Sequence, residues 1–330
     1  MSNKREAYLC LSAMLRAREP KLLNNDRAAR MLDAASFDEA ARMLTDSGYP
    51  DMSQMTVKEL EASLNVRRDE IFAELAKLVP DKLIVDVFKM KYDYHNAKVI
   101  IKAEAMGQDA RRLMSASGRM EPDTLLETYN EDRLSQLPAA FGTALSEAKN
   151  TLARTSNPQL ADFILDRAYF AELRAAANEL GCPFLNGYAD ILTDSTNLKS
   201  AVRTVRMGKG FDFMEEVLIP GGTVGVDRIA AAGDKESIAA LFANSLLDHA
   251  AALGAEAMDG GSMTDFEKAC DNAVTAYLKR AKLVGYGPEA VVAYIAAVEN
   301  EITAVRMILT GRLAGVSPES IRERLRDMYA

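Results

Sequence analysis

The sequence predicts an all-α protein, and three observations support the prediction. Apolar residues recur with the period of a helix through most of the chain, whereas the alternation typical of strands is nearly absent. Only 10 prolines and 19 glycines interrupt the 330 residues. Residue patterns that start helices also occur where the helical periodicity begins.

Three helix starts can be assigned from a Ser/Thr-x-x-Glu pattern, at Ser36, Thr56 and Thr264. The hydroxyl can accept a hydrogen bond from a free N–H of the first turn, while the glutamate three residues later reaches back to the cap. The helix expected after Thr264 continues through residues 265–281, where apolar residues form one stripe. The clearest expected loop is Pro-Gly-Gly-Thr-Val-Gly at residues 220–225.

Composition excludes several classes of protein. The chain carries 40 Lys and Arg against 48 Asp and Glu, a net charge of −8, which argues against nucleic acid as a partner. Three cysteines without a CxxC pair and only two histidines predict neither disulfides nor a metal site, and no cofactor is expected. No segment reaches the roughly 18 apolar residues of a membrane span, and the N-terminus has no signal-peptide pattern. We therefore expect a cytoplasmic protein, at most peripheral to a membrane.

A repeat with the pattern Asn-x5-Lys/Arg-x4-Gly occurs three times, with a period of about one hundred residues. The copies are Asn96, Lys102, Gly107, then Asn197, Arg203, Gly208, and finally Asn300, Arg306, Gly311. A turn followed by a helix start comes after each copy, near Met120, Val224 and Val316. We expect three similar helical domains, residues 1–113, 114–216 and 217–330, arranged around a pseudo-three-fold axis.

The asparagine and the glycine of each copy share one helix face, because residues 4, 7 and 11 positions apart lie close in angle on a helix. The positions between them are mostly small, so this face is expected to pack closely against another helix. The three asparagines are candidates both for fixing helix packing and for contacting a partner.

A basic ridge lies beside that face. It consists of Lys98 and Lys102, Lys199 and Arg203, and Arg306, with Ile302 in place of a lysine in the third copy. One interpretation is a solvated helix face. The other is that the three ridges line a common cavity for a rod-shaped partner, which makes these five cations the candidate partner-binding residues.

The residues of a catalytic site are not evident. The sequence has no HExxH, GxSxG or Walker A motif. His95 is interpreted as structural, Cys182 lacks a histidine nearby, and the Gly208-Lys209-Gly210 triplet lacks the ending of a phosphate-binding loop. A non-catalytic protein is therefore expected. Two alternatives stay open: a helical scaffold for an unrelated partner, and an all-helical enzyme whose carboxylates are dispersed in sequence.

The chain resembles a known family over its whole length. The most specific stretches are Asp93-Tyr-His-Asn96 with Lys102 and Gly107, Asp194-Ser-Thr-Asn197 with Arg203, Glu299-Asn300-Glu301 through Arg306, and Gly315-Val-Ser-Pro-Glu319. They are similar to the C (or d) subunit of V-type and archaeal-type (A-type) rotary ATPases.

The resemblance implies a non-catalytic, funnel-shaped subunit of the central stalk with three similar helical domains. Its cavity would hold the end of a rotor shaft built from the D and F subunits, and its base would rest on the membrane proteolipid ring (c or K). It would thus couple the A–B catalytic head indirectly to proton or sodium transport, on the cytoplasmic side of the membrane.

Overall fold

The computed structural model describes residues 5–232 and 234–330, and within these ranges the chain is helical without any strand. The all-α prediction is confirmed. Within the same ranges, no helix has both the length and the apolar character needed to cross a bilayer.

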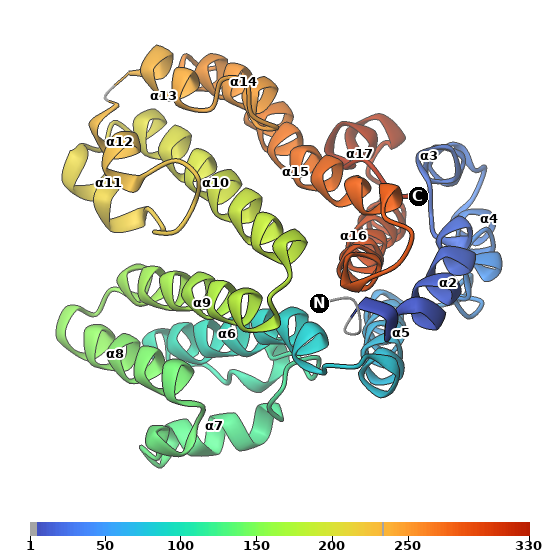
Figure 1. The fold of residues 1–330 in the computed structure, drawn as a ribbon, viewed down its shortest axis with the longest axis horizontal. Coiled ribbons are helices and arrows are strands. Elements are labelled where there is room, and N and C mark those ends of the chain that lie inside the picture. Colours follow the sequence, from blue (N-terminus) through green and yellow to red (C-terminus); the bar gives the residue numbers. More distant parts are fainter. Residues whose placement is uncertain (1–4, 233) are drawn as a thin grey trace.

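The chain falls into four runs of helices (Figure 1). The first run is α2 (Leu9–Arg18), α3 (Asn25–Asp33), α4 (Phe37–Arg42) and α5 (Val57–Leu78). The second is α6 (Leu83–Met106), α7 (Pro122–Asn130), α8 (Ala139–Thr155) and α9 (Pro158–Leu180). The third is α10 (Pro183–Arg206), α11 (Phe211–Val217), α12 (Val226–Ala231), α13 (Lys235–Leu241), α14 (Asp248–Met258) and α15 (Met263–Lys279). The last is α16 (Pro288–Leu313) and α17 (Pro318–Arg324).

Short 3₁₀ turns join several of these helices. They are η1 (Glu19–Lys21), η2 (Thr45–Ser47), η3 (Arg111–Leu113), η4 (Leu134–Gln136) and η5 (Arg280–Leu283).

Two of the three expected helix starts are confirmed. Ser36 caps α4, and Thr56 forms a full capping box with Glu59 at the start of α5. The start expected at Thr264 is wrong, because α15 begins at Met263 with Ser262 as its cap. The Ser262 hydroxyl accepts from the N–H of the residue three positions later at 3.1 Å, so the serine takes the capping role and Thr264 lies inside the first turn.

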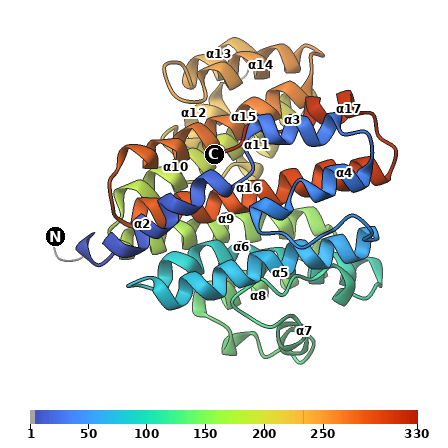
Figure 2. The same ribbon diagram turned by 90° about the vertical axis from the view of Figure 1, so that its right-hand side faces the viewer.

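The three repeat copies lie on the long helices α6, α10 and α16. The short helices α7, α12 and α17 begin where the turn-to-helix signals occur. The first repeat helix, α6, packs mainly on α9, the helix just before α10. In the same way, α10 packs mainly on α15, the last α-helix before α16. The helix α16 packs in the same way on α5, which comes just before α6, so the last repeat is completed by the N-terminal part of the chain. The helix α16 also contacts α4, and Figure 2 shows it alongside α5.

Three buried cores follow this packing. One joins residues 8–90 to residues 278–329 and includes parts of α9 and α10. The second spans residues 94–169, and the third spans residues 191–273. The cores change near residues 90 and 190, because α6 and α10 each contribute one end to one core and the other end to the next, whereas α16 belongs to the first core. The domain ranges 1–113, 114–216 and 217–330 stay a prediction.

Candidate functional site

A cavity of about 490 Å³ lies between α10, α15 and α16. Its apolar wall includes Leu192 from α10 and Met307 from α16. Its polar wall includes Lys199, Asp271 and Arg326, and the Asp271 carboxylate accepts from both Lys199 Nζ and Arg326 Nε at 2.9 Å. The three side chains hold α10, α15 and the C-terminal segment together along one side of the cavity.

A smaller cavity of about 50 Å³ continues from the first. The two share Lys91, Tyr188, Ala296 and Glu299 in their walls, and the smaller one reaches Tyr169 of α9. The pair of cavities therefore lies between α6, α9, α10 and α16. Figure 1 shows how these helices are arranged. We call the two together the axial cavity.

Glu299 is the electrostatic centre of the axial cavity. Its carboxylate accepts from Arg68 Nε at 2.9 Å and from the Tyr92 hydroxyl at 2.6 Å, and it forms an ion pair with Lys91. Burial by itself would raise the pKa of Glu299, but the charges of Lys91 and Arg68 outweigh burial and hold the pKa below its ordinary value. Glu299 is therefore an anion that joins α16 to α5 and α6.

The cations of the basic ridge form ion pairs within the chain itself. Every ridge cation forms an ion pair with the long helix on which its own helix packs. The pairs are Lys98–Asp166 and Lys102–Asp162 between α6 and α9, Lys199–Asp271 and Arg203–Glu267 between α10 and α15, and Arg306–Glu61 between α16 and α5. Ile302 is fully buried, so the third copy replaces a cation by a core residue.

Of the five ridge cations, Lys199 lines the axial cavity, whereas the other four lie along the seams between helices. Their assignment to partner binding stays a prediction, and what the structure shows for them is intramolecular pairing. A sequence signal for this pairing exists. The acids Asp162 and Asp166 are four residues apart, and so are Glu267 and Asp271, which matches the spacing of the cations opposite them.

The repeat asparagines anchor backbone that follows the long helices. Asn96 and Asn197 are fully buried, and each exchanges two hydrogen bonds with one residue downstream. Asn197 donates to the carbonyl of Ile219 and accepts from its N–H, both at 2.8 Å, and Asn96 does the same with Ser115. Asn300 is half-buried and makes one such bond, to the Asp327 carbonyl at 2.9 Å.

The expected close-packing role of two repeat glycines is replaced by a conformational one. Gly107 and Gly208 end their helices with φ of 63° and 65°, and a Cβ at either position would meet no atom within 4 Å. Glycine is favoured there because the left-handed cap strains other residues. Gly311 differs, since it lies inside α16 and a Cβ would come within 2.8 Å of the Ile321 side chain. The cap of α16 falls one turn later, at Gly315 with φ of 71°.

The dispersed carboxylates that an enzyme would need are not gathered in the axial cavity. Burial raises the pKa of Asp93, Asp194 and Glu301, although hydrogen bonds from nearby groups oppose the shift. Each accepts from a backbone N–H of a neighbouring loop, and none of the three lines the axial cavity. Among the described residues, no group of three or more His, Cys, Asp or Glu side chains could hold a metal ion.

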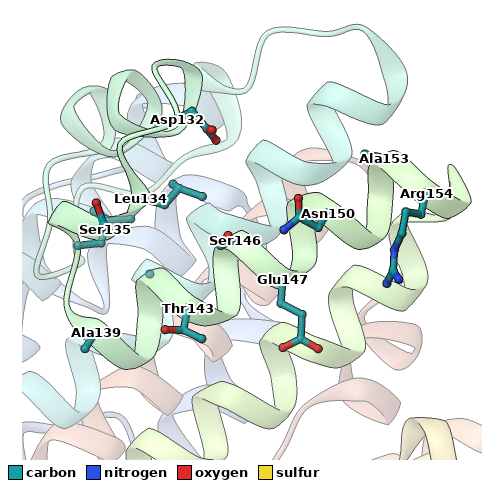
Figure 3. A pocket seen from close by; sticks show the side chains of 12 residues that line it. Asp132, Leu134, Ser135, Ala139, Thr143, Ser146, Glu147, Asn150, Ala153 and Arg154 are labelled. Atoms are coloured by element: carbon teal, nitrogen blue, oxygen red, sulfur yellow. The ribbon is translucent and has the colours of Figure 1, made fainter.

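A second hollow, of about 1060 Å³, lies along α8 (Figure 3). Side chains from one face of this helix, Thr143, Glu147 and Arg154 among them, form its wall together with the segment around Leu134. This hollow is built from a single helix and the turn before it, and it does not touch α10 or α16. The axial cavity is therefore the stronger candidate, because all three repeat helices contribute to it.

The fold and the cavity define an all-helical protein whose three long repeat helices surround a cavity. The model of the ATP synthase (C/AC39) subunit family matches residues 11–324, so the chain belongs to that family. It is 26% identical over 329 residues to the C subunit of the V-type sodium ATPase of Enterococcus hirae, covering 98% of this chain and 99% of that protein. It is 24% identical to the C subunit of the A-type ATP synthase of Methanocaldococcus jannaschii, covering 96% and 86%. The family resemblance read from the sequence is confirmed.

Proposed function

We propose that the protein is a non-catalytic central-stalk subunit of a V/A-type rotary ATPase, peripheral to the membrane on its cytoplasmic side. The axial cavity receives the end of the rotor shaft, made of the D and F subunits, and the base of the protein rests on the proteolipid ring. The protein thereby passes torque between the shaft, turned by the A–B head, and the ring that moves protons or sodium ions.

One observation carries the proposal. The axial cavity lies where helices of all three repeats meet, and ion pairs join these helices around it: the Glu299 cluster on one side, and Lys199, Asp271 and Arg326 on another. A torque adaptor needs a recess on its axis whose walls are connected to one another, and these ion pairs make that connection.

Affinity capture from gently solubilised membranes tests the assembly. The tagged chain is expected to bring down the D and F subunits and the proteolipid, identified by mass spectrometry. Capture of a folded chain with none of them would overturn the proposal in favour of a scaffold for an unrelated partner.

A cavity variant tests the place of shaft binding. Thr303 is exposed and lines the cavity, so Thr303→Arg adds bulk and charge there without opening the core. We expect this variant to lose at least tenfold in affinity for a purified D–F complex, because a steric clash in a recess removes contacts on both sides. Thr143→Arg is the matched control, since Thr143 is also an exposed helical threonine but lies on α8. Equal D–F affinity in the two variants would remove the axial cavity as the socket.

A further inference from the structure

Another cavity, of about 330 Å³, lies where the N-terminal helices pack on α16. Its walls come from the end of α2, the η1 and η2 turns, α5 and Tyr294 of α16. Three cations, Arg18, Lys21 and Arg67, line it together with two acids, Asp46 and Glu74. None of these residues lines the axial cavity.

One acid and one cation of this cavity neutralise each other. Both oxygens of Glu74 accept from the two terminal nitrogens of Arg18, at 2.7 and 2.8 Å. This bidentate pair keeps the pKa of Glu74 below its ordinary value. The remaining charges are those of Lys21 and Arg67, opposed by the exposed carboxylate of Asp46. The cavity therefore retains a net positive charge.

Hydrogen-bond donors in the same cavity wall are unused. Ser47 is only 4% exposed, and within the described residues its hydroxyl has no hydrogen-bond partner. The same is true of Arg67 Nε, although Arg67 Nη2 donates to the Ser47 carbonyl at 3.1 Å. Buried polar groups are normally paired, so two unpaired donors on residues of one cavity wall favour a ligand that accepts hydrogen bonds.

The backbone brings these donors together. Gly48 follows Ser47 with φ of 83°, and a Cβ at Gly48 would lie 3.3 Å from both terminal nitrogens of Arg67. The guanidinium also lies over the Tyr49 ring, 5.3 Å from its centroid. The left-handed turn and the ring thus fix Arg67 beside Ser47 instead of letting it extend into solvent.

From this geometry we propose that the cavity binds a phosphate group, held by Lys21, Arg67 and the Ser47 hydroxyl. The chemistry fits either free inorganic phosphate or the terminal phosphate of a nucleotide, because both present several oxygens to guanidinium and hydroxyl donors. A bound phosphate would link the η1 turn, the η2 turn and α5 where the N-terminal helices close on α16. This inference is independent of the proposed function.

Calorimetric titration of the purified full chain with inorganic phosphate, against chloride at equal ionic strength, tests the site. We expect saturable binding and a rise in melting temperature with phosphate. Lys21→Gln should weaken binding roughly tenfold, because it removes a charged donor whose side chain has no partner among the described residues. Ser47→Ala should also weaken binding, and Asp46→Asn should strengthen it.

Lys58→Gln is the matched control, since Lys58 is exposed on α5 and does not line the cavity. An absence of binding beyond the chloride effect, or equal losses in Lys21→Gln and Lys58→Gln, would overturn the proposal. A parallel titration with ADP distinguishes the sources. Tighter binding of ADP than of phosphate, lost in Lys21→Gln, assigns the site to a nucleotide phosphate, whereas binding of phosphate alone assigns it to the free anion.

Discussion

The long helices of the first two repeats and the long helix of the third repeat pack on different parts of the chain. The helices α6 and α10 each pack on a helix that follows them in sequence, through pairs of half-exposed ion pairs. The helix α16 has no such helix after it, and it closes instead on α5, from the opposite end of the chain. This seam has one half-exposed pair of the same kind, Arg306–Glu61, and adds the Glu299 cluster.

The two kinds of seam are therefore held together by different ion pairs. The α6–α9 and α10–α15 seams each use two half-exposed ion pairs, and the pairs Lys98–Asp166 and Lys199–Asp271 join residues 68 and 72 positions apart. The α16–α5 seam must bring together residues more than two hundred positions apart, and it uses an ion pair shielded from solvent: Arg68 is 5% exposed. Removing one partner of a shielded pair is costly, because the other charge is then left buried without a counter-ion.

The largest expected effect comes from removing the Glu299 charge. Glu299→Gln leaves Arg68 without its counter-ion, and we expect a loss of about 3 kcal/mol in the free energy of unfolding. The matched control is Glu267→Gln, which removes the partner of the half-exposed Arg203 and should cost below about 1 kcal/mol. Chemical denaturation measures both. Similar losses in the two variants would show that the closing seam is no different from the others.

The same pair predicts a pH dependence. The pKa of Glu299 is depressed in the folded protein, so its contribution is fully present above the ordinary glutamate pKa of about 4.3 and is lost as the pH falls through the folded-state value. The stability difference between the wild type and Glu299→Gln should therefore be constant near neutral pH and shrink in acid. A difference that grew in acid would contradict the assigned direction.

A smaller effect separates the repeat asparagines. Asn197→Ala removes two hydrogen bonds and leaves the N–H and carbonyl of the buried Ile219 without partners, so we expect a loss of about 2–3 kcal/mol. Asn300→Ala removes one bond at a half-buried position and should cost about 1 kcal/mol or less. Thermal and urea unfolding compare the two. Equal costs would mean that the third repeat is anchored as firmly as the second.

The sequence predicts the fold class and the repeat helices because both depend on short-range patterns. The caps at Ser36 and Thr56 and the asparagine repeat lie within single helices or their ends. The ion pairs of the basic ridge were not predicted, because the acids opposite Lys98 and Lys199 lie 68 and 72 residues away. The packing of α16 on α5 could not be predicted from the repeat, because the N-terminal helices carry no copy of the asparagine pattern. The axial cavity likewise depends on how helices from different repeats meet.

The smallest expected effect distinguishes the two uses of glycine in the repeats. Gly208→Ala should cost about 1 kcal/mol, because alanine is strained at φ of 65°, and Gly208→Asn should recover much of that loss since asparagine tolerates this conformation. At Gly311 the constraint is space, so Gly311→Leu should cost about 1–3 kcal/mol by displacing the buried Ile321 side chain. Gly311→Ala should be nearly neutral, because the gain in helix propensity offsets a small shift of the end of that side chain. The denaturation midpoints of these four variants measure the costs. If Gly208→Asn were as damaging as Gly208→Ala, the left-handed cap would not explain the glycine at this position.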